Sequence, residues 1–111
     1  TVGQWHEMRS NNPIRLSAET DRIYQGDVAH VQLQDSGWNR TLHIKTQHSR
    51  SLVLWNPHIE KSMRLNQFAP DAWRRMVCIE SANVAKDMLM LLPGESCWLE
   101  TEITMQPNAS V

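Results

Sequence analysis

The chain has 111 residues, of which 41% are hydrophobic, and this size and composition fit one domain with a real core rather than a disordered segment. Eleven basic and twelve acidic residues give a formal net charge of −1, and no basic run offers a footprint for DNA or RNA. The longest apolar run, "MLMLLP", is far shorter than the roughly 20 residues of a membrane helix. We therefore expect a single cytoplasmic domain, residues 1–111, with neither nucleic acid nor a membrane as partner.

The opening of the chain has no regular pattern. Residues 1–18 show neither strand alternation nor helix periodicity, so we expect an irregular opening segment. The chain starts at Thr1 without a methionine. The opening is therefore expected to be the middle of a longer polypeptide.

The rest of the chain contains short strand-like segments separated by turn signals. In residues 28–35 apolar and polar side chains alternate, which predicts a half-buried strand. The turn sequence "DSGWN" follows and predicts a hairpin with residues 41–46. The predicted strands are residues 22–25, 28–35, 41–46, 51–56, 76–80, 87–93 and 97–104. Short strands with tight turns and almost no helix indicate an all-β, antiparallel fold.

One long connection separates the strands. Pro57 ends the strand before it, and Pro70 interrupts the segment that follows, so residues 57–75 predict an irregular excursion. Ile59 and Met63 indicate a helical turn within it. Long irregular connections in compact domains are often functional.

The two cysteines lie in apolar strand patterns. Cys78 and Cys97 are therefore expected to be reduced, buried thiols rather than a disulfide. Neither has the spacing of a metal site, and we expect no metal and no cofactor.

Glu80 ends an apolar strand without a basic neighbour. Period-two alternation places Met76, Cys78 and Glu80 on one face, and Val77 and Ile79 on the other. A carboxylate that shares a face with Met and Cys is expected to face an interior or a pocket, where it needs a partner or a chemical task. A solvated strand end is the alternative reading.

Asp21 in "ETDRIY" is the second candidate site residue. It is either a ligand-binding carboxylate, a turn aspartate, or the partner of Arg22 in an ion pair. The five tryptophans fit either stacking on a sugar or packing in a small β-protein core.

The histidines differ in their surroundings. His30 and His43 lie on polar strand faces and are expected to be solvated, and His48 lies in a turn. His58 stands near a strand end in the irregular excursion, although a lone histidine is usually not catalytic.

Four strings occur in a fixed order along the chain: "ETDRIY", "LVLWNPHIEKS", "RRMVCIESANVA" and "LLPGES". From about Glu19 to the end, this order resembles the C-terminal part of the hexose-6-phosphate 1-epimerases, in the aldose 1-epimerase (galactose mutarotase-like) superfamily. The resemblance implies the C-terminal portion of a mutarotase-type antiparallel β-sandwich. It also implies a sugar or sugar phosphate as ligand.

The resemblance implies a role for each candidate residue. Glu80 matches the general base that takes the proton of the anomeric hydroxyl, after which the ring opens, rotates about C1–C2 and closes with the opposite configuration. Asp21 would hold a sugar hydroxyl, and Trp55 and Asn56 would shape the pocket floor. His58 stands where the family commonly has an aromatic residue.

Two parts of the family pattern are missing. The acid histidine and the phosphate-binding arginines of the family belong to its N-terminal half, so we expect this chain alone to be weak or inactive. Half a sandwich also leaves open strand edges, to be covered by the missing half or by a second copy in a homo-oligomer. A non-catalytic carbohydrate-binding or structural β-domain that dimerises through these edges is the alternative.

Overall fold

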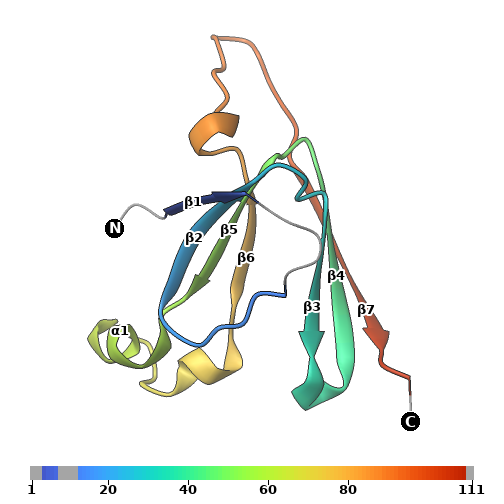
Figure 1. The fold of residues 1–111 in the computed structure, drawn as a ribbon. Helices are drawn as coiled ribbons and strands as arrows, with labels where there is room; N and C mark the ends of the chain where they lie inside the picture. Colours follow the sequence, from blue (N-terminus) through green and yellow to red (C-terminus); the bar gives the residue numbers. More distant parts are fainter. Residues whose placement is uncertain (1–3, 8–12, 110–111) are drawn as a thin grey trace.

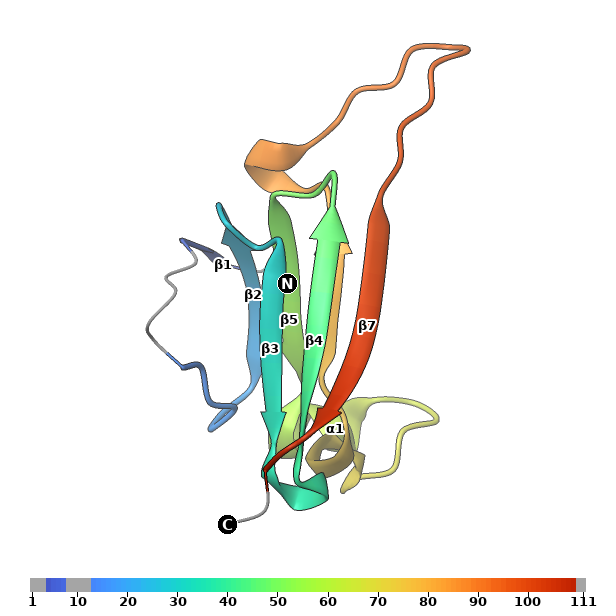
Figure 2. The same ribbon diagram turned by 90° about the vertical axis from the view of Figure 1, so that its right-hand side faces the viewer.

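The computed structural model describes residues 4–7 and 13–109, which form two β-sheets packed face to face (Figures 1 and 2). One sheet has the strand order β1-β2-β5-β6 and the other β3-β4-β7. The strands are β1 (Gln4–Glu7), β2 (Thr20–Gln25), β3 (His30–Asp35), β4 (Arg40–Gln47), β5 (Ser51–Asn56), β6 (Cys78–Ala82) and β7 (Glu100–Pro107). The predicted all-β sandwich is confirmed, and all strand pairs except β1–β2 are antiparallel.

The hydrophobic core lies between the two sheets. Its buried members are Tyr24, Val28, Leu52 and Leu54, against which Leu16, Val31, Val77 and Ile79 pack. The sheets are also joined by a hydrogen bond of 2.6 Å between Oγ1 of Thr46 on β4 and Oγ of Ser81 on β6. Apolar packing and this polar contact together fix how one sheet lies on the other.

The hairpin predicted around "DSGWN" is confirmed. Strands β3 and β4 pair in register, and a 3-10 turn, Ser36–Trp38, joins them. The Asp35 carboxylate accepts a hydrogen bond from the Trp38 backbone N–H, and Asn39 adopts a left-handed conformation with φ 50°. Asparagine tolerates this conformation better than most residues.

The opening segment differs from its prediction at residues Gln4–Glu7, which form strand β1. This strand runs parallel to β2, with Gln4 opposite Arg22. The segment QWHE is only four residues long and has one apolar residue, too short a stretch for alternation to mark it as a strand. Residues 1–3 and 8–12 of the same segment lie outside the described residues.

The strand predicted over residues 87–93 is wrong. A 3-10 turn, Ala85–Asp87, leads instead into a loop that projects from the sandwich and returns to β7 (Figures 1 and 2). No strand of the described part of the chain pairs with this loop, and the apolar side chain of Met90 is 83% exposed. Cys97 is exposed in the same loop, so its predicted burial is also wrong, whereas Cys78 is half-buried; both thiols are free.

The excursion between β5 and β6 is anchored by one amide side chain. It contains helix α1 (His58–Arg64), which confirms the predicted helical turn, and a 3-10 turn (Ala72–Arg75). Asn56 is only 2% exposed, and its Nδ2 donates to the carbonyl oxygens of Trp73 and Met76, each at 2.9 Å. Its Oδ1 accepts the backbone N–H of His58, also at 2.9 Å. The side chain therefore fixes both ends of the excursion.

No helix among the described residues has the length and apolar character needed to cross a bilayer.

Replacing Asn56 tests this anchor. Asn56→Ala leaves buried backbone groups without their partners, so we expect the free energy of unfolding in urea to fall by about 2–4 kcal/mol. Asn66→Ala, at an exposed asparagine of the same excursion, is the matched control and should change stability by less than about 0.5 kcal/mol. Equal effects of the two variants would contradict the anchoring role.

Candidate functional site

Three of the predicted site residues share one face of the four-stranded sheet. Asp21 is paired with Trp55, and Trp55 with Cys78, so these side chains form a row across β2, β5 and β6. Glu80 belongs to the neighbouring row, opposite Val53. Residues directly opposite one another, and residues two apart on one strand, point to the same side of a sheet. The fold thus brings Asp21, Trp55 and Glu80 to one surface, turned away from the core.

The two carboxylates of this surface lie on either side of Trp55. Asp21 and Glu80 are two strands and two residues apart, roughly 12 Å between Cα atoms in an ordinary sheet. Trp55 lies on the strand between them and is half-buried. The two carboxylates therefore flank the tryptophan on the same surface.

Asp21 has no ion pair with its neighbour. Arg22 is the next residue on the strand and points to the opposite face, and within residues 4–7 and 13–109 no salt bridge joins the two. The Asp21 side chain lies within strand β2 rather than in a turn, and it is partly exposed. Its carboxylate is therefore available on the candidate surface.

Glu80 occupies the predicted face but not the predicted environment. Val77 and Ile79 pack on the core, which confirms the alternation, while Cys78 and Glu80 point the other way. Glu80 is exposed, so the interior setting is wrong and the solvated alternative holds. The reason is that β6 is the edge strand of its sheet in the described part of the chain. Burial, with a smaller effect of the Glu80 charge, raises the pKa of the Cys78 thiol.

Asn56 and His58 lie outside this surface. Asn56 follows Trp55 and so points to the core side, where its amide is committed to backbone groups. The His58 ring contacts Trp73, with 4.4 Å between ring centroids, and the guanidinium of Arg74 lies 5.3 Å from the same tryptophan ring. His58 thus belongs to a stack at the end of the sheet, three residues beyond Trp55.

The sequence model of the family described as "Aldose 1-epimerase" matches residues 2–104. The chain belongs to this family. The resemblance inferred from the four ordered strings is thereby confirmed. The match includes Asp21, Trp55 and Glu80, and it also covers residues before Glu19, where the strings gave no signal.

Curated relatives of this aldose 1-epimerase family member carry one name, "Putative glucose-6-phosphate 1-epimerase". The protein of Haemophilus influenzae is 28% identical over 95 residues, which cover 86% of this chain and 32% of the relative. That of Cenchrus ciliaris is 27% identical, covering 74% and 25%, and that of Salmonella typhimurium is 31% identical, covering 56% and 21%. The chain thus spans about a third or less of the length of these relatives. No solved structure matches it significantly.

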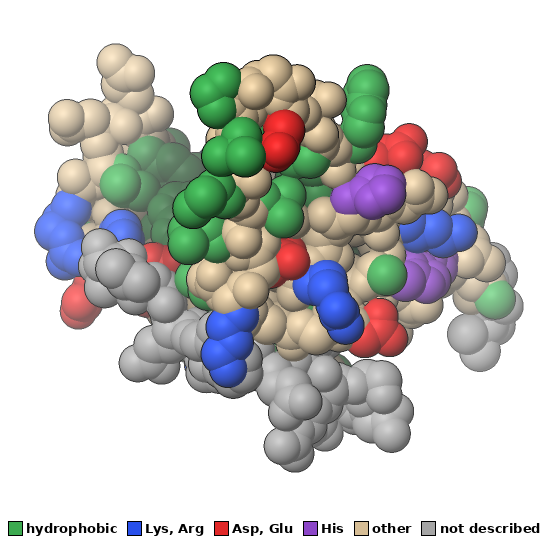
Figure 3. Space-filling view, turned by 90° about the horizontal axis from the view of Figure 1, so that it is seen from above, with side chains coloured by type: hydrophobic (Ala, Val, Ile, Leu, Met, Phe, Trp, Pro, Cys, Tyr) green, Lys and Arg blue, Asp and Glu red, His purple; other side chains and the backbone are tan. Residues whose placement is uncertain are grey.

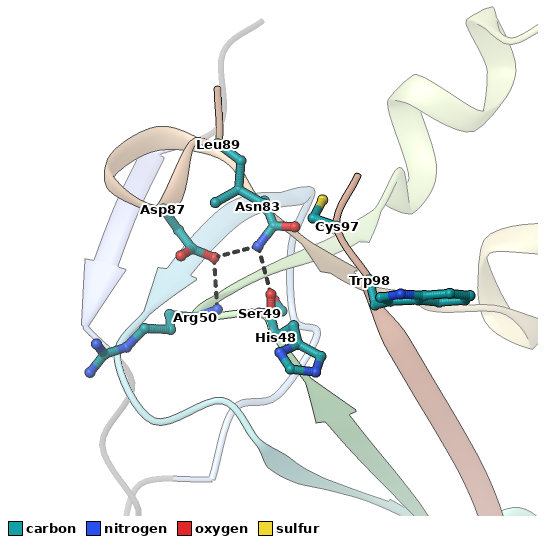
Figure 4. Close-up of a pocket in the computed structure, with 8 residues that line it drawn as sticks. All are labelled: His48, Ser49, Arg50, Asn83, Asp87, Leu89, Cys97 and Trp98. Atoms are coloured by element: carbon teal, nitrogen blue, oxygen red, sulfur yellow. Dashed lines mark hydrogen bonds between the residues drawn. The ribbon is translucent and has the colours of Figure 1, made fainter. Parts of the chain in front are cut away.

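A pocket of this family member lies near the beginning of β5, away from Trp55, which lies near the end of the same strand. It is an open pocket of about 490 Å³, lined by His48, Ser49, Arg50, Asn83, Asp87, Leu89, Cys97 and Trp98 (Figure 4). None of the predicted site residues lines it. Nor do three His, Cys, Asp or Glu side chains gather as a metal site anywhere in residues 4–7 and 13–109.

Asp87 organises the polar side of this pocket. Its Oδ2 accepts hydrogen bonds from the Arg50 backbone N–H at 2.7 Å, from Asn83 Nδ2 at 3.0 Å and from Ser51 Oγ at 3.2 Å. Asn83 Nδ2 also donates to the His48 carbonyl at 2.9 Å (Figure 4). Partial burial acts to raise the pKa of Asp87, but these donors and the Arg50 charge outweigh it and lower the pKa below its ordinary value. The carboxylate therefore ties the start of β5 to the segment after β6.

Sequence reasoning missed this pocket because its residues come from three separate segments. The available signal was Trp98, which falls on the polar face of the strand predicted over residues 97–104. In the structure Trp98 is 80% exposed at the base of the projecting loop. Trp38 is also exposed, and Trp55 and Trp73 are half-buried, so the core reading is wrong for these four tryptophans.

Acid titration tests the Asp87 contacts. The lowered pKa of folded Asp87 means that its carboxylate stabilises the fold above about pH 4, and that this contribution is lost as the pH falls through the folded-state pKa. We expect Asp87→Asn to reduce the urea midpoint at pH 7 and the difference from wild type to shrink towards pH 3. Asp27→Asn, which removes an exposed carboxylate without these donors, is the control. A difference for Asp87→Asn that is independent of pH would contradict the assignment.

Proposed function

We propose that this chain supplies the base-bearing part of a sugar 1-epimerase that interconverts the α and β anomers of a hexose phosphate. Family membership and the common surface of Asp21, Trp55 and Glu80 support the proposal, and the shared surface is the observation on which it rests most directly. The name of the relatives makes glucose 6-phosphate the first substrate to test. The chain is expected to act in the cytoplasm.

In the proposed reaction Glu80 accepts the proton of the anomeric hydroxyl. The C1–O bond of the ring then breaks as the ring oxygen takes up a proton from an acid, which gives the open-chain aldehyde. Rotation about C1–C2 and reclosure by the reverse steps give the opposite anomer. Asp21 accepts a hydrogen bond from a sugar hydroxyl, and the Trp55 ring packs against an apolar face of the sugar.

Two predicted ligands have supporting tasks in this proposal. Asn56 holds the excursion that follows Trp55, and His58, in its stack with Trp73, borders the Asp21 end of the surface. Because Glu80 is exposed and the resemblance places the acid histidine in another part of the family's chain, the 111 residues alone should exchange anomers slowly.

The anomer exchange of glucose 6-phosphate, followed by NMR exchange spectroscopy, tests the role of Glu80. We expect a modest acceleration over the spontaneous rate by the wild-type chain and a return to the spontaneous rate in Glu80→Gln, since removal of a general base costs roughly 10²-fold, more than the acceleration itself. Glu100→Gln, at an exposed glutamate of β7, should leave the acceleration intact. An acceleration that survives Glu80→Gln would refute the base assignment.

A second candidate function is interaction through open surfaces. Ile103 and Met105 of β7 are paired with Ile44 and Leu42 and point towards the core side, yet they are 65% and 57% exposed. Apolar side chains also gather over the end of the molecule that carries the projecting loop, Met88–Leu92 among them (Figure 3). Exposed apolar surface of this kind is typical of a binding interface. We propose that a second copy of the chain, or a polypeptide equivalent to the remainder of its longer relatives, covers this surface. Sugar binding without anomer exchange would also favour a non-catalytic role.

Sedimentation velocity tests self-association. We expect the wild-type chain to form dimers at micromolar concentration and Ile103→Lys to be monomeric, because the lysine places a charge in the apolar contact. Thr104→Lys changes the neighbouring residue on the opposite face of β7 and should leave the dimer intact. A wild-type chain that remains monomeric at all concentrations would exclude the homodimer.

A further inference from the structure

Two histidines on the outer face of the three-stranded sheet lie with their rings against each other, which solvation alone does not explain. His30 on β3 and His43 on β4 are diagonal neighbours across the strand pair, since His30 is opposite Lys45 and His43 is opposite Gln32. The Nε2 of His30 lies 2.9 Å from the Nδ1 of His43, and the ring centroids are 5.2 Å apart. The two rings therefore present nitrogen atoms to each other.

This separation suits a metal chelate. Imidazole nitrogens bind first-row divalent ions at about 2.0–2.1 Å, so two adjacent ligand positions place them about 2.9–3.4 Å apart. The observed 2.9 Å falls in that range. Small rotations of the exposed rings are enough to turn both lone pairs towards one ion.

Gln106 on β7 prepares His43 for this role. Its Oε1 lies 3.2 Å from the Nε2 of His43, and a carbonyl oxygen can only accept a hydrogen bond. Nε2 therefore has the hydrogen and Nδ1 has the lone pair that faces His30. A hydrogen bond of this kind from the second ring nitrogen is the usual device that orients a metal-ligating histidine.

The charged side chains directly across the strands from this pair are Lys45 and Glu102, and Glu100 lies further along β7 on the same face. Lys45 is opposite His30 and opposes a bound cation, while Glu102 is opposite Lys45 on β7 and favours one. The direct neighbours of His43, Gln32 and Thr104, are neutral. The nearest two charges largely offset each other and Glu100 adds a more distant attraction, so the chelate itself contributes most of the affinity.

We propose that His30 Nε2 and His43 Nδ1 form a chelating site for Cu(II), and with lower affinity for Ni(II) and Zn(II), with water in the remaining positions. The order follows the general preference of nitrogen ligands for these ions. In the free protein Nε2 of His30 donates to Nδ1 of His43; on binding, that hydrogen moves through water to Nδ1 of His30, and neutral rings release no proton. The site is independent of the proposed epimerase surface.

Titration of the 111-residue chain with copper(II) chloride, followed by calorimetry and by electron paramagnetic resonance, tests the site. We expect one tight site per chain with two nitrogen ligands. His30→Gln and His43→Gln should each raise the dissociation constant at least tenfold. The double variant should bind copper no more weakly than either single variant, because the loss of one histidine already removes the chelate. Gln106→Ala keeps every histidine and should still weaken binding about tenfold.

Two controls separate this site from other copper ligands. His48→Asn removes a histidine at φ 65°, a conformation that asparagine tolerates, and should leave the affinity unchanged. Acetylation of the N-terminal amine should also leave it unchanged. Affinity that is unaffected by His30→Gln and His43→Gln, or lost on acetylation, would overturn the proposal.

Discussion

Strand β5 is the constraint on which the rest of the molecule depends. It lies between β2 and β6, and its register with each of them determines which side chains share a face. Hydrogen bonds of polar side chains hold both of its ends. At the beginning, Ser51 Oγ donates to the Ala82 carbonyl and to the Asp87 carboxylate. At the end, the Asn56 amide donates to two backbone carbonyls of the excursion. Buried polar groups need partners, so these contacts also fix the length of the strand.

The two faces of this sheet serve different purposes. One face contributes Tyr24, Leu52 and Leu54 to the core, while the other presents Asp21 and Trp55 on a partly open surface. The open surface, the edge position of β6 and the exposed side of β7 all suit a chain that spans a third or less of its relatives.

The sequence predicted what local patterns determine. Alternation located β3 and β4, a short apolar run located β5, and alternation correctly placed Val77 and Ile79 opposite Cys78 and Glu80. It could not predict β1, which is four residues long with one apolar residue. Nor could it predict the absence of a strand in the apolar segment after Asp87, because no strand of the described residues pairs with that segment. The exposure of Glu80 depends on what lies beyond β6, and the Asp87 network joins segments far apart in the chain; neither leaves a local pattern.

The pairing of β6 with β5 has a consequence for how the candidate base is kept in place. A slip of one residue would exchange the positions of Ile79 and Glu80, which would remove an apolar side chain from the core and drive a carboxylate into it. Burial of an unpaired charge is costly enough to make such a misfolded register rare. Val77 and Ile79, which need not contact a sugar, thus select the register in which β6 pairs with β5. In that register the carboxylate of Glu80 points outward.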